Sequence, residues 1–315
     1  MKTKTPNKLF IRNIPAIRKG ILTGIFFSFL VFGNPFQILG QNRLHLSAFG
    51  GISNYQGDLQ YRKFAANQSH LALSLGLTYD ITPNISAKGM ISRAKLGAHD
   101  KYNLPSLQFR NLSFETILYE GSLTMEYRLF DLNERKFTPY VFAGFAIFRF
   151  QPYTYDSTGT GKKIFLRPLS TEGQGLPQYP ERKPYNNIQP AIPFGGGVKY
   201  RVTDNAVLGI QVNLRKLFTD YLDDVSMDYV DPDILLAEKG PLAVEYSYRA
   251  DELHNGNPDY PAFNVRGSSR YNDWYYFTGI TLEIGLNTGN LFRPMGGNSG
   301  GMRNRNSLKC PTNVY

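Results

Sequence analysis

Alternation of apolar and polar residues between Leu71 and Leu96 sets the pattern for the whole chain. From Leu71 to Tyr79, large apolar residues occupy every odd position, while small or polar residues occupy the even positions. A period of two residues predicts a β-strand with one apolar face. The run ends at Asp80 to Asn84, where proline and asparagine favour a turn, and a second extended run follows from Ile85. The sequence therefore predicts a hairpin here.

The same kind of segment recurs along the body of the chain. We expect eight strands, at Leu44–Ile52, His70–Tyr79, Ile85–Leu96, Thr116–Phe130, Thr138–Gln151, Gln189–Val202, Ala206–Phe218 and Trp274–Asn287. Short connections (80–84, 131–136, 203–205) alternate strictly with long ones (53–69, 97–115, 152–188, 219–273). Barrels of the outer membrane have short turns at one rim and long loops at the other. The alternation therefore predicts an all-β fold, an eight-stranded antiparallel transmembrane β-barrel with short periplasmic turns and long extracellular loops.

Charged residues fall on the face opposite the apolar one. Between Tyr119 and Leu129 the odd positions are apolar or glycine and the even positions are charged or hydroxylated, and the runs 208–215 and 276–286 repeat this division. A water-soluble barrel would place its apolar side chains inside instead, so this pattern predicts an exterior that faces lipid. We expect an internal charge network made of Glu120, Glu126, Arg128, Arg149, Arg215 and Glu283. Because side chains fill an eight-stranded barrel, no wide channel is expected.

Aromatic residues gather near the ends of the expected strands. They are Tyr79, Tyr127, Tyr140, Phe148, Phe150, Tyr200, Phe218, Trp274, Tyr275 and Tyr276. Such side chains prefer the headgroup level of a membrane, where one edge of the ring stays wet. The collective pattern predicts aromatic girdles, although ordinary packing within a sheet is the alternative for each single residue.

The net charge of +10 comes from the two ends of the chain. Six cations lie within the first twenty residues and four lie after Asn287, and neither segment contains an acid. The body of the chain is therefore neutral, which leaves a nucleic-acid-binding surface unsupported. A single cysteine excludes an internal disulfide framework and a cysteine-rich zinc site.

Both ends predict segments outside the barrel. Residues 1–40 have the layout of a secretory signal peptide: a basic start, an apolar stretch shorter than the roughly 20 residues of a membrane-spanning helix, and Gly40 at the cut site. An uncleaved anchor is the alternative, because Ile38 fits a cleavage site poorly. We therefore expect a signal peptide (1–40), an outer-membrane barrel (41–287) and a basic periplasmic tail (288–315). Cys310 in that tail predicts an intermolecular disulfide or a free thiol, unless it is incidental.

No motif predicts catalysis, a cofactor or a bound metal ion. Gly195–Gly197 is similar to a phosphate-binding loop, but a strand follows where a helix is needed, so close approach of backbones explains it better. The acidic stretch 220–233 lacks the EF-hand pattern, and we favour a solvated loop over a calcium site. The histidines show no metal-ligand spacing, although catalytic use of one, as in lipid hydrolases of the membrane, stays open. They are His45, His70, His99 and His254.

Four motifs at the ends of the strands resemble those of one family. They are Asn54-Tyr-Gln-Gly57-Asp58-Leu59, Arg110-Asn-Leu112-Ser113-Phe114, Phe218-Thr-Asp220-Tyr-Leu-Asp223-Asp224-Val-Ser226, and Arg266-Gly267 with Asn272-Asp273-Trp274-Tyr275. Together they resemble the PorG-like outer-membrane barrel family of Bacteroidetes, a component of the type IX secretion system. The resemblance covers most of the chain from Leu44 to Leu286.

The resemblance implies a non-enzymatic anchor in the cell outer membrane that holds a periplasmic ring for protein secretion. The implied partners are outer-membrane lipid, the ring lipoprotein and associated secretion subunits, with no nucleic acid. Because the chain continues beyond the last strand, the tail is the candidate contact with the periplasmic partner. Its candidate partner-binding residues are Cys310, Arg303, Arg305 and Lys309. Two other classes stay open: a structural or adhesion barrel that acts through its outer loops, and a lipid-modifying barrel enzyme.

Overall fold

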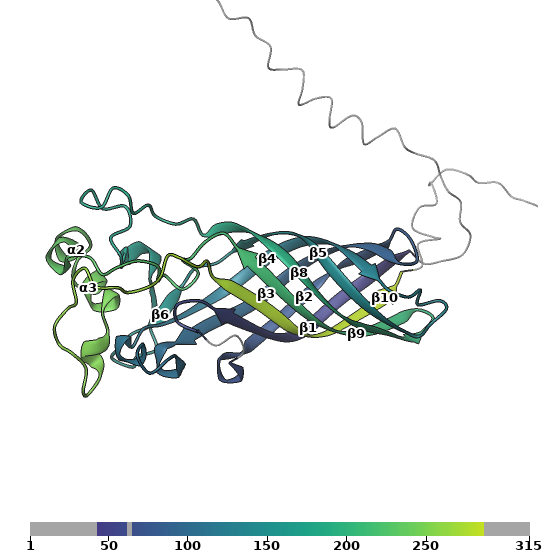
Figure 1. The fold of residues 1–315 in the computed structure, drawn as a ribbon, viewed down its shortest axis with the longest axis horizontal. Helices are drawn as coiled ribbons and strands as arrows, with labels where there is room; N and C mark the ends of the chain where they lie inside the picture. Colours follow the sequence, from purple (N-terminus) through teal and green to yellow (C-terminus); the bar gives the residue numbers. More distant parts are fainter. Residues whose placement is uncertain (1–42, 62–64, 287–315) are drawn as a thin grey trace, which may run out of the picture. The chain divides into compact units, whose positions relative to one another are not determined.

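The computed structural model describes residues 43–61 and 65–286. Eight long antiparallel strands pair in a closed ring, in the order β1-β2-β3-β4-β5-β8-β9-β10 and back to β1 (Figure 1). The strands are β1 (Leu44–Gln56), β2 (His70–Asp80), β3 (Ile85–His99), β4 (Ser113–Arg128), β5 (Phe137–Arg149), β8 (Ile188–Thr203), β9 (Ala206–Leu217) and β10 (Trp274–Gly285). Each of these strands has a hydrogen-bonded neighbour on both sides, so the ring has no open edge. The predicted eight-stranded antiparallel barrel is confirmed.

Short and long connections separate to opposite rims. We call the rim with connections 81–84, 129–136 and 204–205 the turn end, and the rim with connections 57–69, 100–112, 150–187 and 218–273 the loop end. The long connections contain β6 (Tyr153–Tyr155), β7 (Lys163–Phe165), α2 (Pro232–Lys239), α3 (Pro241–Ser247) and the 3-10 turns η1 (Ala66–Gln68), η2 (Asp100–Tyr102), η3 (Gln108–Arg110), η4 (Arg167–Leu169) and η5 (Ala250–Glu252). Within the described residues, no helix has the length and apolar content needed to cross a membrane.

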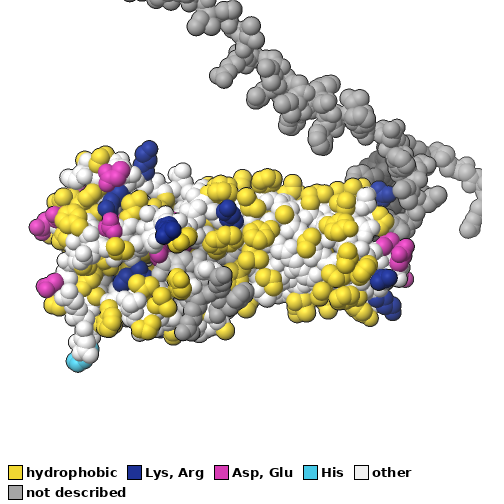
Figure 2. Space-filling view, in the orientation of Figure 1, with side chains coloured by type: hydrophobic (Ala, Val, Ile, Leu, Met, Phe, Trp, Pro, Cys, Tyr) yellow, Lys and Arg dark blue, Asp and Glu magenta, His cyan; other side chains and the backbone are white. Residues whose placement is uncertain are grey.

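The outer wall of the barrel is apolar. On the face shown in Figure 2, hydrophobic side chains cover the wall, while most charged side chains lie toward the two ends. Large outward-facing side chains are mostly accessible, including Ile91 (74% exposed) and Phe145 (77% exposed). Leaving such surface in water costs about 25 cal/mol per Å². The barrel wall therefore suits a lipid environment, and the predicted division of apolar residues outside and charged residues inside is confirmed.

The predicted aromatic girdles are only partly correct. Tyr79, Tyr127 and Tyr200 are exposed near the turn end, and Phe218 is exposed beside the loop end. Five others are buried, namely Tyr140, Phe148, Phe150, Tyr275 and Tyr276. Tyr140, Phe148 and Tyr275 occupy inward-facing positions of β5 and β10. A position near the end of a strand therefore does not by itself predict that an aromatic side chain faces lipid.

Gly195 and Gly197 lie where β8 and β9 approach closely. A Cβ atom at Gly195 would lie 2.1 Å from the carbonyl oxygen of Val212, and one at Gly197 would lie 2.1 Å from that of Ile210. No side chain can be placed there without moving the neighbouring backbone. The glycines therefore allow close packing of two strands, as the sequence predicted.

Candidate functional site

Four charged side chains form a balanced cluster inside the barrel. Lys88 Nζ lies 3.2 Å from Glu126 and 2.6 Å from Glu283. Lys199 Nζ contacts the same two carboxylates, with Glu283 at 2.9 Å. All four side chains are buried, and they come from β3, β4, β8 and β10. Each buried charge therefore meets two opposite charges, which offsets the cost of removing it from water.

A second buried ion pair lies nearer the loop end. Arg215 on β9 donates to both carboxylate oxygens of Glu120 on β4, through Nε at 3.0 Å and through a terminal nitrogen at 2.9 Å. The Tyr275 hydroxyl also donates to Glu120. The Arg215 guanidinium lies 3.8 Å from the centre of the Phe277 ring. This bidentate geometry fixes the arginine across the lumen.

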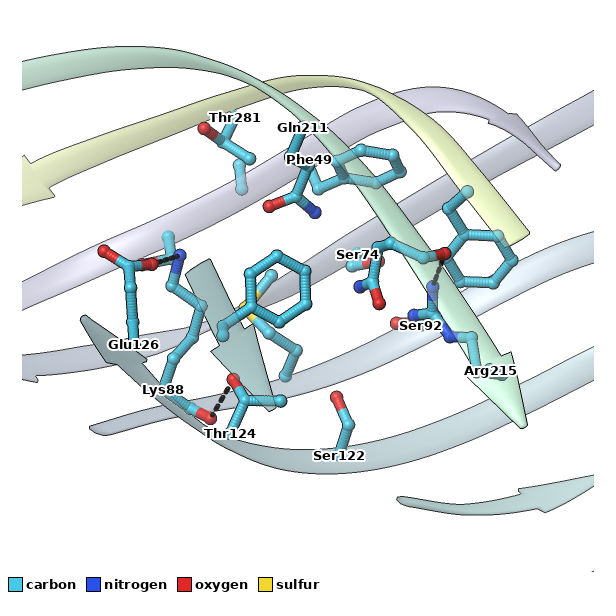
Figure 3. Close-up of a pocket in the computed structure, with 16 residues that line it drawn as sticks. Phe49, Ser74, Lys88, Ser92, Ser122, Thr124, Glu126, Gln211, Arg215 and Thr281 are labelled. Atoms are coloured by element: carbon cyan, nitrogen blue, oxygen red, sulfur yellow. Dashed lines mark hydrogen bonds and ion pairs between the residues drawn. The ribbon is translucent and has the colours of Figure 1, made fainter. Parts of the chain in front are cut away.

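A small enclosed cavity separates the two charged groups (Figure 3). Figure 3 shows Lys88 and Glu126 on one side of it, Arg215 on the other, and small hydroxylated side chains such as Ser122 and Thr124 between them. Its free volume is about 30 Å³, which has room for a water molecule or two. Side chains therefore block the lumen, and the barrel is not an open pore.

The predicted charge network is wrong in one member. Five of the predicted residues are buried inside: Glu120, Glu126, Arg128, Arg215 and Glu283. Arg128 pairs with Asp80 near the turn end at 2.8 Å. Arg149 instead faces outward and is exposed, because it shares the odd parity of Phe145 and Ile147 on β5. Its two neighbours in sequence, Phe148 and Phe150, are the residues that face inward.

Sequence reasoning missed the two lysines of the interior. Lys88 and Lys199 supply both positive charges of the balanced cluster. Each lies at an inward position, between Ala87 and Gly89 on β3 and between Val198 and Tyr200 on β8. The alternation of residues along β3 and β8 is the sequence signal that marks both lysines as inward-facing.

The long connections at the loop end fold together into a unit that we call the cap. Leu176 from connection 150–187 packs with three residues of connection 218–273, Val230, Leu235 and Ala243. Helix α2 begins there because the Asp231 side chain accepts hydrogen bonds from the first turn, ahead of a proline at the first helical position. The cap therefore has an apolar core of its own.

Residues of the resembling motifs meet in the cap. The Tyr55 hydroxyl lies 2.6 Å from a carboxylate oxygen of Asp223 and 2.9 Å from one of Asp273. Arg110 donates to the backbone carbonyl of Asp58 at 2.9 Å. Segments far apart in the sequence thus form one polar centre above the barrel, which makes this centre the candidate functional site.

Arg266 is the buried cation of this centre. It donates to the Glu172 carboxylate at 2.9 Å, to the Asp224 carbonyl at 2.8 Å and to the Ser247 carbonyl at 3.1 Å. Glu172 also accepts a hydrogen bond from the backbone N–H of Ser226 at 3.0 Å. Arg266 therefore ties connection 150–187 to connection 218–273, and each of its contacts is removed from solvent.

Four other buried acids of the cap form no ion pair within the described residues: Asp220, Asp223, Asp224 and Asp273. Tyr55 has one hydroxyl proton for the two carboxylates beside it, so a proton on the Asp223–Asp273 pair would complete the second contact. Burial raises the pKa of Asp273 to about 8 and that of Asp220 to about 9, and it raises the pKa of Asp223 well above its usual range. The polar centre is therefore assembled around protonated carboxyl groups.

The cap should lose stability as the pH rises. In the folded cap these acids keep protons that an unfolded chain releases near pH 4. Their favourable contribution is therefore complete below about pH 4 and is lost progressively as the pH rises from there to the folded-state pKa values of about 8 to 9. Within that pH range, each of these acids that is protonated in the closed cap and ionised in the opened cap favours opening by up to roughly tenfold per pH unit. Amide hydrogen exchange of connection 218–273, corrected for intrinsic rates, measures this loss.

Asp220→Asn should reduce this pH dependence, because the amide cannot ionise. The matched control is Asp251→Asn, at an exposed position of the same connection. A flat exchange profile of the wild-type cap between pH 5 and pH 9 would contradict the prediction.

The acidic stretch 220–233 is not the solvated loop that the sequence favoured. Asp220, Asp223 and Asp224 are buried, and Asp224 accepts hydrogen bonds from Thr171 and Tyr185, each at 2.6 Å. Across residues 43–61 and 65–286, no three His, Cys, Asp or Glu side chains are arranged to hold a metal ion. The calcium alternative therefore gains no support from the structure.

The candidate residues of the tail lie outside the described residues. These are Cys310, Arg303, Arg305 and Lys309. The predicted signal peptide and the predicted barrel end at Asn287 also lie outside them. These interpretations stay predictions.

The strands and the interior together define a class, a closed eight-stranded β-barrel with an apolar wall, a filled lumen and a folded cap. At the level of sequence, the family model "Domain of unknown function (DUF6089)" matches residues 23–164, which include β1 to β6. No curated protein sequence matches the chain.

Several solved structures are similar to this chain. Neisserial surface protein A has a TM-score of 0.39 at 10% identity, over 77% of this chain and 97% of that one. Ail of Yersinia pestis has a TM-score of 0.37 at 8% identity, over 78% and 99%. The outer membrane protein OprG of Pseudomonas aeruginosa has a TM-score of 0.36 at 11% identity, over 78% and 99%. Because these TM-scores are low, the fold assignment rests on the strand pairing of this structure. The PorG-like resemblance stays a prediction.

Proposed function

We propose that this protein is a non-enzymatic barrel of the outer membrane that acts through its rims and its outer wall. The observation that carries this proposal is the blocked lumen, closed by the balanced cluster around Lys199 and by the Glu120–Arg215 pair. A transport barrel needs a continuous water-filled path, which such a plug denies. The apolar wall supports residence in lipid, and the separation of connections supports a periplasmic turn end and an extracellular loop end.

The particular role that we propose is to anchor a periplasmic ring of the type IX secretion system. Support comes from the motif resemblance, whose residues build the polar centre of the cap. In this proposal the barrel holds the membrane position, and the basic tail 288–315 contacts a ring lipoprotein on the periplasmic side. Three cations and one thiol of the tail are the proposed contacts: Arg303, Arg305, Lys309 and Cys310.

A non-reducing pull-down after gentle membrane extraction tests this role. We expect the wild-type protein to bring down a periplasmic ring lipoprotein, partly as a disulfide adduct. The Cys310→Ser variant should lose the adduct, and replacing Arg303, Arg305 and Lys309 with serine should weaken the non-covalent recovery. Deletion of the protein should abolish secretion through the system. If the lipoprotein is recovered equally without Cys310, the anchor stands and the covalent contact does not.

An adhesion barrel is the second candidate, favoured by apolar side chains exposed on the cap. Phe263 is 64% exposed and Val265 is 73% exposed. Phe263 also holds a left-handed backbone conformation, at φ +64°, which is uncommon for a bulky residue. Recovery of the barrel alone in the same pull-down, with secretion intact after deletion, would contradict the anchor and favour this candidate.

A further inference from the structure

A shallow groove crosses the outer wall over strands β2 to β5. Its volume is about 710 Å³. Two outward-facing glycines on neighbouring strands, Gly89 and Gly121, form its floor, and a Cβ atom added at either would meet nothing within 4 Å. Large apolar side chains border it: Leu75, Leu77, Ile91, Leu123, Phe145 and Ile147. The groove is therefore an apolar depression in the outer wall, bordered by large side chains.

Two arginines stand at the loop-end margin of this groove. On β4, Gly121 pairs with Ile91 of β3, and two residues nearer the loop end Tyr119 pairs with Arg93 of β3 and Arg149 of β5. Both arginines are exposed on the outward face. Since adjacent strands lie about 4.8 Å apart, the two arginine backbones are roughly 10 Å apart, with Tyr119 between them. This row places two cations and a phenol directly above the apolar floor.

The positive charge at this margin is uncompensated. Neither Arg93 nor Arg149 forms an ion pair with any residue that the structure describes, whereas the neighbouring Lys95 pairs with Glu115 at 2.8 Å. Arg93 Nε lies 3.4 Å from the Tyr119 hydroxyl, which leaves its terminal nitrogens available. Cations beside a lipid-facing wall are costly unless they reach the interface and meet anions there. The guanidinium fork matches a phosphate group in shape and charge.

We propose that this groove binds a phosphorylated glycolipid of the outer leaflet. A phosphate of the lipid lies between Arg93 and Arg149, and one acyl chain follows the groove over Gly121 and Gly89. These glycines lie two and four residues from the arginine row, or about 7 and 13 Å along the strand, which falls within one leaflet of a bilayer whose apolar core is roughly 30 Å thick. The inference rests on the proposed outer-membrane position with the loop end outside, and it does not depend on the secretion role.

Native mass spectrometry of the detergent-purified protein with diphosphoryl lipid A tests the site. We expect wild-type protein to retain lipid A and to bind a dephosphorylated lipid A roughly tenfold more weakly or worse. The double variant Arg93→Gln, Arg149→Gln should lose the same preference for phosphate. The double variant Gly89→Leu, Gly121→Leu should also bind less, because its side chains occupy the groove from two positions where an added Cβ atom meets nothing within 4 Å.

Matched controls lie on other parts of the same wall. Lys216→Gln removes an outward-facing cation of β9, and Gly50→Leu fills an outward-facing glycine position of β1. Both should bind lipid A as the wild type does. Equal binding of phosphorylated and dephosphorylated lipid A would overturn the inference, and so would unchanged binding in either double variant. The inference would also fail if the protein is a dimer that the glycine variants dissociate with no change in bound lipid. Recovery of the ring lipoprotein in the pull-down, measured separately, shows which of the two proposals has failed.

Discussion

We expect Lys199→Met to lower the free energy of unfolding of the barrel by about 3–5 kcal/mol. The substitution leaves Glu126 and Glu283 sharing Lys88 as their one cation, so the interior carries an uncompensated negative charge. Removing one partner of a buried ionic group is far more costly than replacing the whole group with neutral side chains. Urea unfolding of the protein in lipid vesicles, followed by its heat-dependent mobility in gels, measures the loss.

Two further variants define what this loss means. Lys216→Met removes a lysine from the outer wall and should change stability by less than about 0.5 kcal/mol. Adding Glu126→Gln to Lys199→Met restores equal numbers of positive and negative charges and should recover much of the stability. If the single substitution Lys199→Met leaves the protein as stable as the wild type, the balanced cluster does not stabilise the barrel.

We expect Arg266→Met to open the cap and to leave the barrel folded. The variant strands the Glu172 carboxylate without its cation and removes two hydrogen bonds to backbone carbonyls, for an expected local cost of about 3–5 kcal/mol. Limited proteolysis should then cut within connections 150–187 and 218–273, while the strands stay protected. Hydrogen exchange across the same connections gives the magnitude.

The control for the cap is Arg270→Met, four positions further along the same connection and exposed. It should leave proteolysis unchanged. If Arg266→Met unfolds the barrel together with the cap, the two are one cooperative unit, and the independent apolar core around Leu235 does not stabilise the cap by itself.

The barrel could be predicted from the sequence because its signal is local. Along each strand, apolar and polar side chains alternate with a period of two residues. The lengths of the connections assign each one to a rim, and neither pattern requires knowledge of tertiary contacts. The sequence prediction of the interior is wrong or incomplete at two positions where the alternation of inward and outward residues gives the correct side. Arg149 lies on the same outward face as the apolar residues Phe145 and Ile147, so alternation along β5 predicts that it faces outward. Lys199 lies between the outward residues Val198 and Tyr200, so the same rule predicts that it faces inward.

The cap could not be predicted because its contacts are not local. Tyr55 and Asp223 are 168 positions apart in the chain, and nothing near either residue indicates their hydrogen bond. If each carboxyl group of the stretch 220–233 is assumed to be charged, the stretch is expected to be exposed to solvent. Burial and shared protons change this, but they depend on the folded surroundings. Asp224 adds a left-handed backbone conformation, at φ +67°, that its sequence does not require.

The balanced cluster also makes the charge balance of the lumen depend on closure of the ring. Its members enter the chain with β3, β4, β8 and β10, and Glu283 arrives on the strand that closes the ring against β1. An assembly intermediate that lacks β10 holds Lys88 and Lys199 against Glu126 alone, with a surplus positive charge facing inward. Closure of the ring by β10 therefore also balances the charge of the interior, because β10 brings one of the two carboxylates of the cluster.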